Sequence, residues 1–188
     1  MTLLTIGVLL WSVVHLTTTL RLGVRSALRE KMGEGPYKGV VTLLLLLSIL
    51  LIVLGWRSAE FVHVYDPPLW NSPIVLMIMF LSFLLFSASR PGSNIRHWIR
   101  HPQLSGLIVW AIAHLLANGD SRSLVLFGGL GLWAVITMLA TNKRDGAWER
   151  PKLGPWTRDL VGAGITFVLF CVVAFLHPWF TGMQVLTR

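Results

Sequence analysis

The apolar stretch GVVTLLLLLSILLIVLGW, residues 39–56, decides the fold class of this chain. It carries no charged side chain, and a helix of about 20 such residues is long enough to cross the hydrocarbon core of a bilayer. Five further apolar segments flank it, at residues 3–22, 72–88, 103–118, 123–141 and 160–181. The first has no basic leader and no small-residue cleavage site, so we expect it to stay in place as a span. The sequence therefore predicts an all-α integral membrane bundle of six transmembrane helices, formed by one domain over residues 1–188.

The composition of the chain supports this prediction. Hydrophobic residues make up 54% of the sequence and charged residues 13%, whereas a soluble domain carries about 25% charged residues. A net charge of +8 would suggest a nucleic-acid partner in a soluble protein, but here the basic residues lie between apolar segments. We therefore expect the lipid bilayer as a partner, and no nucleic acid. The single cysteine, Cys171, excludes an internal disulfide and a cysteine-based zinc site.

The distribution of Lys and Arg predicts the orientation of the bundle. The loops after the first, third and fifth spans hold every Lys and Arg except Arg57, Arg122 and Arg188. Cytoplasmic loops of membrane proteins are enriched in Lys and Arg, so these three loops are expected to face the cytoplasm. With six spans, both termini are then expected outside the cytoplasm.

Two histidines lie well inside predicted spans, where ionisable side chains are expensive and usually functional. His15 follows Trp11 by four residues, and His114 follows Trp110 by the same spacing. Residues four apart share one face of a helix, so we expect each indole to lie beside the imidazole that follows it. Both imidazoles are therefore candidates for a chemical role in an apolar setting.

Haem is the cofactor that such a pair suits best. Zinc usually needs three or four ligands and proton relays usually include Asp or Glu, whereas haem iron needs only one or two axial imidazoles in an apolar slot. Basic residues at the membrane edge can then pair with the haem propionates. The alternative interpretation is that each histidine only forms a hydrogen bond with a neighbouring helix.

The depths of the two histidines argue against simple ligation of one iron. His15 lies about 9 Å from the cytoplasmic end of its span and His114 about 9 Å from the outer end, at about 1.5 Å per residue. In a core of about 30 Å the two side chains would differ in depth by roughly 12 Å. Helix tilt, or a longer first helix, can close this gap. Otherwise His101 or His177 becomes a candidate for the second ligand.

The remaining histidines are weaker candidates. His97 and His101 lie one turn apart, a spacing that can bind a metal, but they lie at a basic interface and we expect them to be solvated. His63 is expected to be solvated in an outer loop. His177 precedes a Pro-Trp pair at the outer end of the sixth span, where aromatic anchoring at the membrane interface is the ordinary interpretation.

Several different short motifs are spread along the chain, from the first span to the last. The central block carries Arg100-His101-Pro102-Gln103 and then WAIAHLLANGD at residues 110–120. It is preceded by PGSNIR at residues 91–96 and by GEGPY at residues 33–37. The first span contributes His15, and the C-terminal segment contributes the pattern His177, Trp179 and Gly182. Together these motifs resemble the NnrU family over nearly the whole chain.

This resemblance implies a cofactor and its ligands. The family includes a plant and cyanobacterial branch, 15-cis-zeta-carotene isomerase, which is understood as a haem b enzyme that rotates a conjugated cis double bond. Its two proposed axial histidines match His15 and His114. The expected site residues are the metal ligands His15 and His114, with His101 and His177 as substitutes, and Trp11, Trp110, Arg100 and His101 as further cofactor-binding residues; no catalytic residue is assigned.

The resemblance also implies a cellular role. The central block reads LLANGD at residues 115–120, as in the bacterial branch of the family, which is associated with denitrification and nitric oxide metabolism. A protein of the bacterial inner membrane with periplasmic termini is therefore expected. If isomerase activity is inherited, its partner is an apolar polyene or isoprenoid such as a carotenoid, and its iron is redox-gated.

Two other functions remain open. The run Arg100-His101-Pro102 followed by Gly106 is similar to an S-adenosylmethionine-binding motif of membrane methyltransferases of the isoprenylcysteine carboxyl type. Those enzymes usually have Tyr where Leu104 stands, and their later acidic pair has only Asp145 and Glu149 as counterparts. The other interpretation is a non-catalytic accessory protein of respiratory and denitrification enzymes.

Overall fold

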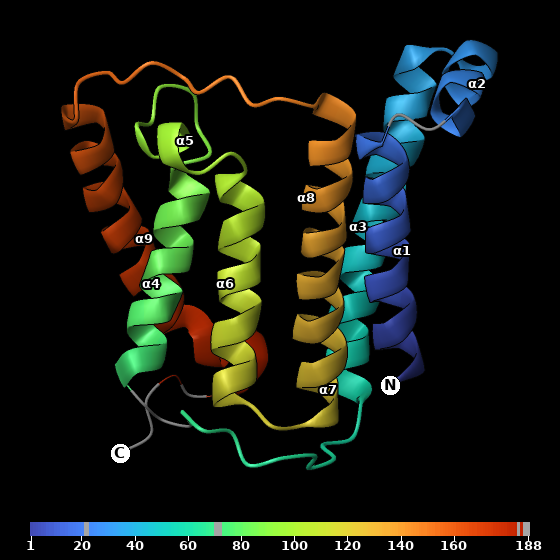
Figure 1. The fold of residues 1–188 in the computed structure, drawn as a ribbon. Helices are drawn as coiled ribbons and strands as arrows, with labels where there is room; N and C mark the ends of the chain where they lie inside the picture. Colours follow the sequence, from blue (N-terminus) through green and yellow to red (C-terminus); the bar gives the residue numbers. More distant parts are fainter. Residues whose placement is uncertain (21–22, 70–72, 184, 186–188) are drawn as a thin grey trace. The chain divides into compact units, whose positions relative to one another are not determined.

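The computed structural model describes residues 1–20, 23–69, 73–183 and 185, and the secondary structure of this part of the chain is helical apart from one backbone bridge between His63 and Asp120 (Figure 1). The predicted all-α fold class is confirmed. The helices are α1 (Thr2–Thr19), α2 (Gly23–Met32), α3 (Glu34–Ser58), α4 (Pro73–Ser87), α5 (Ile95–Trp98), α6 (Pro102–Ala117), α7 (Ser121–Ser123), the π-helical turn η1 (Leu124–Gly128), α8 (Gly129–Asp145) and α9 (Thr157–Thr181).

Four helices of the described chain are long and apolar enough to cross a bilayer. They are α1, α3, the continuous helix Ser121–Asp145 formed by α7, η1 and α8, and Thr157–Trp179 within α9. Helices α4 and α6 are apolar but have 15 and 16 residues, about 23 Å at 1.5 Å per residue, against a core of about 30 Å. The apolar pattern in the sequence thus located all six of these apolar helices. Four helices of this length and composition identify a membrane protein, and a total of six transmembrane helices remains a proposal. The predicted boundaries at residues 22 and 72 lie outside the described residues.

The backbone divides into two compact units. Unit 1 consists of Met1–Val64 and Asp120–Gly146, and unit 2 consists of Tyr65–Gly119 and Ala147–Arg188. Unit 1 contains α1, α2, α3 and the Ser121–Asp145 helix, and unit 2 contains α4, α5, α6 and α9. The single domain expected over residues 1–188 stays a prediction.

In unit 1, α1 lies side by side with α3 because glycines let the two backbones approach (Figure 1). Gly55 of α3 lies directly against the backbone of Leu4, and a Cβ at Gly55 would overlap it. Gly7 of α1 faces α3 in the same way, since a Cβ there would lie 2.7 Å from the backbone nitrogen of Ile52. Small residues at such crossings are typical of helix packing in lipid. α8 also packs against α1.

The basic segment after α1 folds into helix α2. The Arg25 guanidinium donates a hydrogen bond to the carbonyl oxygen of Thr18 at 2.8 Å, and Arg144 of α8 donates one to the carbonyl of Thr19. The last carbonyls of a helix have no partner within the helix and carry partial negative charge. These two cations therefore stabilise the C-terminal end of α1.

In unit 2, α4 packs against α6 and α9. The Ser82 hydroxyl of α4 donates a hydrogen bond of 2.8 Å to the carbonyl oxygen of Gly106, whose missing side chain lets the two helices approach. Phenylalanines join α4 to α9, with ring centres 5.4–5.8 Å apart between Phe80 or Phe83 and Phe167 or Phe170. Aromatic packing and a buried hydroxyl therefore hold these three helices together.

Candidate functional site

His15 lies in the second half of α1 within a cluster of three rings in unit 1. Its Nδ1 donates a hydrogen bond to the carbonyl oxygen of Trp11 at 3.1 Å, so Nε2 is the acceptor nitrogen of the neutral ring. The Trp11 ring lies 4.1 Å from the imidazole, between ring centres, which is the neighbour that the spacing predicted. Trp133 of α8 lies 5.2 Å from the imidazole on another side. Sequence reasoning missed Trp133, because it is far from His15 along the chain.

The two indole N–H groups of this cluster have no acceptor within the described part of the chain. The Nε1 atoms of Trp11 and Trp133 are buried and form no hydrogen bond with any residue that the structure describes. A buried donor without a partner costs about 1–3 kcal/mol, so buried polar groups are normally satisfied. The three-ring cluster therefore offers two unused donors and one imidazole acceptor in the middle of an apolar helix pair.

His114 of α6 repeats this local arrangement in unit 2. Its Nδ1 donates a hydrogen bond of 3.0 Å to the carbonyl oxygen of Trp110, and the two ring centres are 4.8 Å apart. The Trp-x-x-x-His spacing therefore produces the same tautomer and the same aromatic neighbour in both units. Donation from Nδ1 to a backbone carbonyl is the arrangement that usually orients a histidine for metal binding through Nε2.

The structure brings His177 of α9 to His114. The centres of the two imidazoles are 6.5 Å apart, and their planes differ by 29°. The Nδ1 of His177 donates to the carbonyl oxygen of Met183 at 3.0 Å and lies 3.2 Å from the Thr181 hydroxyl. His177, expected only as a substitute ligand, is therefore the histidine that unit 2 places beside His114.

The other predicted site residues lie away from these rings. His101 precedes α6, and the 13 residues to His114 span roughly 20 Å of helix, so the two cannot bind one ion. The expectation of a solvated His97 is wrong, because its half-buried ring donates from Nδ1 to the carbonyl of Pro151 at 2.8 Å. Within the described residues, no three His, Cys, Asp or Glu side chains lie close enough to hold a metal ion together.

The residues after His114 hold the end of α6 in place within unit 2. The Asn118 side-chain amide donates to the carbonyl oxygen of His114 at 2.9 Å. The Tyr65 hydroxyl donates to the carbonyls of Leu115 and Asn118, and the Tyr65 carbonyl lies so close to Gly119 that a Cβ there would overlap it. The Asn-Gly pair is a turn signal that could have predicted this close approach.

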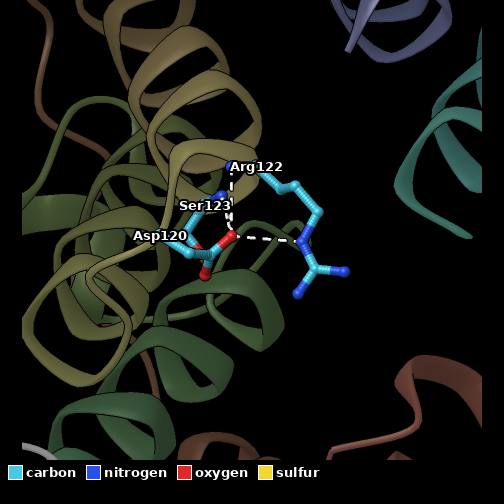
Figure 2. A network of polar contacts seen from close by, with 3 residues as sticks. All are labelled: Asp120, Arg122 and Ser123. Carbon is cyan, nitrogen blue, oxygen red and sulfur yellow. Dashed lines mark hydrogen bonds and ion pairs between the residues drawn. The ribbon is translucent and has the colours of Figure 1, made fainter. Parts of the chain in front are cut away.

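Asp120 immediately precedes the Ser121–Asp145 helix in unit 1 and caps it (Figure 2). Its carboxylate accepts hydrogen bonds from the hydroxyl and backbone nitrogen of Ser123, at 2.6 and 3.2 Å, and from the backbone nitrogen and Nε of Arg122, at 3.0 and 3.2 Å. Burial alone would raise the pKa of Asp120, but these hydrogen bonds and the charge of Arg122 outweigh it and hold the pKa below its ordinary value. The cap therefore contains an ionised carboxylate.

We expect Asp120→Asn to lower the free energy of unfolding by about 1–3 kcal/mol at pH 7, because it weakens charge-assisted hydrogen bonds at a buried cap. The folded-state pKa is depressed, so this stabilisation is complete above the unfolded-state pKa and is lost as the pH falls through the folded-state pKa. Thermal unfolding in micelles should therefore show a gap between the two proteins that narrows below about pH 4. An equal gap at all pH values would show that the charge of Asp120 contributes nothing.

Comparison with known proteins gives one match. The family model described as NnrU protein matches residues 3–185 of the 188-residue chain, a range that includes both ring clusters and the cap at Asp120. No curated protein and no solved structure matches the chain. Because the match covers nearly every residue, and the motifs around His15 and His114 fall within it, the chain belongs to the NnrU family.

Proposed function

We propose that this NnrU family member is an integral membrane protein that binds haem b, with His114 as one axial ligand. The observation that carries the proposal is the orientation of the imidazoles in apolar helices. His15, His114 and His177 each donate from Nδ1 to a backbone carbonyl, which leaves Nε2 as the nitrogen able to coordinate iron.

The surroundings of the histidines fit this cofactor. Haem needs one or two imidazoles, aromatic and aliphatic walls, and partners for its two carboxylates. The apolar helices provide the walls, and Trp110 contacts His114 directly. The unused indole N–H groups of Trp11 and Trp133 are donors that an oxygen-bearing cofactor can satisfy. The absence of any group of three or more ligating side chains among the described residues does not count against a cofactor that supplies four nitrogens of its own.

Two ligand pairs are possible for the iron, and they differ in the residue that accompanies His114. The resemblance to zeta-carotene isomerase implies His15, which belongs to unit 1, as the partner of His114 in unit 2. The contact within unit 2 supports His177 instead. His114 is the ligand common to both pairs, so its role is the sharpest part of the proposal.

The proposed activity is cis–trans isomerisation of an apolar polyene or isoprenoid, or a role in nitric oxide metabolism. Bound haem supplies an iron whose ligation and charge change with its redox state. The protein's own residues hold each imidazole in the Nδ1–H tautomer and exclude water with aromatic side chains. Purified reduced protein in lipid should convert a cis-carotenoid to its trans isomer, and an unchanged carotenoid would contradict the isomerase activity alone.

An absorbance spectrum of the purified protein, expressed with supplemented haem, tests the cofactor. We expect a Soret band of low-spin haem b in the oxidised protein, extractable because the chain has no Cys-x-x-Cys-His attachment motif. A preparation without a Soret band would overturn the proposal. S-adenosylmethionine bound in such a preparation would support the methyltransferase alternative, with Arg100 and His101 as its contacts.

We further propose that α4 and α6 complete a six-span topology in the bacterial inner membrane, with both termini in the periplasm. The support is the apolar composition of both helices and the placement of Lys and Arg. In a Cys171→Ala background, a cysteine introduced at Asn142 should react with an impermeant maleimide only from the cytoplasm. A cysteine at Asp66 should react only from the periplasm, and labelling of both positions from one side would show that the topology is wrong.

A further inference from the structure

An open pocket of about 350 Å³ lies in unit 2 where α9 begins. Its wall consists of Arg90, Pro91, Thr157, Arg158, Val161 and Gly162. The lining therefore includes two guanidinium groups, of Arg90 and Arg158, and the apolar side chain of Val161. The pocket is separate from His114 and His177, because Arg158 and His177 lie near opposite ends of α9.

Arg90 is held in this pocket by contacts with both α4 and α9. Its guanidinium donates to the carbonyl oxygen of Arg158 at 2.7 Å and to the Ser87 hydroxyl at 3.3 Å. It lies across Gly162, where a Cβ would overlap the guanidinium. The glycine thus makes room for a fixed positive charge beside the first turn of α9.

The charge of Arg158 has no partner among the residues that the structure describes. No hydrogen bond or ion pair of its guanidinium is found among the described residues, and it passes beside Gly92. The neighbouring carboxylate, Asp159, instead accepts hydrogen bonds from the Ser93 hydroxyl at 2.6 Å and the Asn94 backbone nitrogen at 3.0 Å. The pocket therefore keeps a net positive charge, and the N-terminal end of the α9 dipole adds to it.

An apolar stripe continues from the pocket along α9. Val161, Ile165, Val168 and Val172 follow one another at helical spacing, and each is exposed, by 63%, 55%, 60% and 47%. The opposite face of α9 carries Phe167 and Phe170, which contact α4. The stripe is therefore an exposed apolar surface, and it begins at Val161, which lines the pocket beside the two arginines.

We infer that this pocket binds the phosphate of an anionic phospholipid, whose acyl chains lie along the Val161–Val172 stripe. A phosphate group suits paired guanidinium groups, which donate to its oxygens with a fixed geometry. The stripe and the position at the end of a spanning helix favour a lipid over free phosphate, because acyl chains gain contacts that an inorganic ion lacks. Anionic lipids are attracted by basic residues at the membrane edge.

Native mass spectrometry of the full chain, released from neutral micelles, can measure this binding. The protein is titrated in parallel with dioleoyl phosphatidylglycerol, dioleoyl phosphatidylcholine and inorganic phosphate. We expect saturable binding of phosphatidylglycerol, about fivefold tighter than that of phosphatidylcholine, and no binding of phosphate alone. Arg158→Gln should remove most of this preference, and Arg158→Lys should retain part of it because the charge stays.

Arg150→Gln is the matched control, since it removes one positive charge from the segment before α9 but leaves the pocket intact. The Arg150 guanidinium lies over the ring of Trp148 in a cation–π contact, 5.4 Å from the ring centre. Equal losses in Arg150→Gln and Arg158→Gln would show that overall charge, and not the pocket, attracts the lipid. Equal affinity for both lipids would also overturn the inference, and tight binding of phosphate alone would identify a site for a free anion instead.

Discussion

Replacing His114 by alanine should remove most of the haem from the purified protein. Changes to groups that merely orient a metal ligand cost about 10–100-fold in affinity, so loss of the ligand itself should lower the Soret absorbance per protein at least about tenfold. The expectation rests on His114 being the one histidine shared by both possible axial pairs. Its side chain is half-buried in α6, held by the carbonyl of Trp110.

Parallel variants make this prediction specific. If His15 is the second ligand, His15→Ala should shift the oxidised spectrum from low spin to high spin, while His177→Ala leaves it low spin; if His177 is the ligand, the outcomes exchange. His97→Ala is the control, because His97 contacts Pro151 in a different part of unit 2. Unchanged haem content and spectrum in His114→Ala would rule out His114 as a ligand. Loss of haem in His97→Ala as well would point to general misfolding.

Replacing Gly55 by alanine should destabilise unit 1 strongly. A Cβ at this position overlaps the backbone of Leu4, which cannot move aside as a flexible side chain could. Overpacking of a tight interior costs about 1–3 kcal/mol and occasionally more, and a backbone-to-backbone clash belongs at or above the upper end of that range. We expect α1 and α3 to separate partly, with a clear fall in the unfolding temperature in micelles.

Gly39→Ala is the matched control in the same helix. Gly39 lies in α3, and nothing surrounds a Cβ built there within 4 Å. Alanine is a better helix former than glycine by about 0.5–1 kcal/mol, so this variant should be neutral or slightly more stable. Thermal unfolding followed by tryptophan fluorescence compares the two proteins. Equal unfolding temperatures for Gly55→Ala and the parent would mean that the close contact between α1 and α3 is absent.

Much of the local chemistry around the histidines could be predicted from the sequence. The four-residue spacing from Trp11 to His15 and from Trp110 to His114 correctly predicted which indole lies beside each imidazole. This prediction succeeds because residues one turn apart are neighbours in any α-helix, independently of the tertiary structure. The carbonyl partner of each Nδ1 follows from the same turn of helix.

Contacts between distant segments could not be predicted in this way. The sequence left His177 as an interface anchor or a substitute ligand and did not show that it lies beside His114, and it gave no signal that Trp133 joins the His15 cluster. No periodic pattern relates residues on different helices, since their contact depends on how the helices cross. The Asp120 cap lies between these cases, because an Asp before a helix is a local signal but its contact with Arg122 depends on side-chain direction.

The sequence by itself determined that this chain is a helical membrane protein, where its apolar helices lie, and which histidines sit inside them. These properties follow from composition and helical period, which act over one or a few turns. The tertiary structure decided which side chains meet: His114 with His177, Arg90 across Gly162, and Gly55 against Leu4. The physical reason is that the bilayer solvates all apolar helices of similar composition about equally well. Which helices pack together is therefore decided by their shape and by the small residues at each crossing.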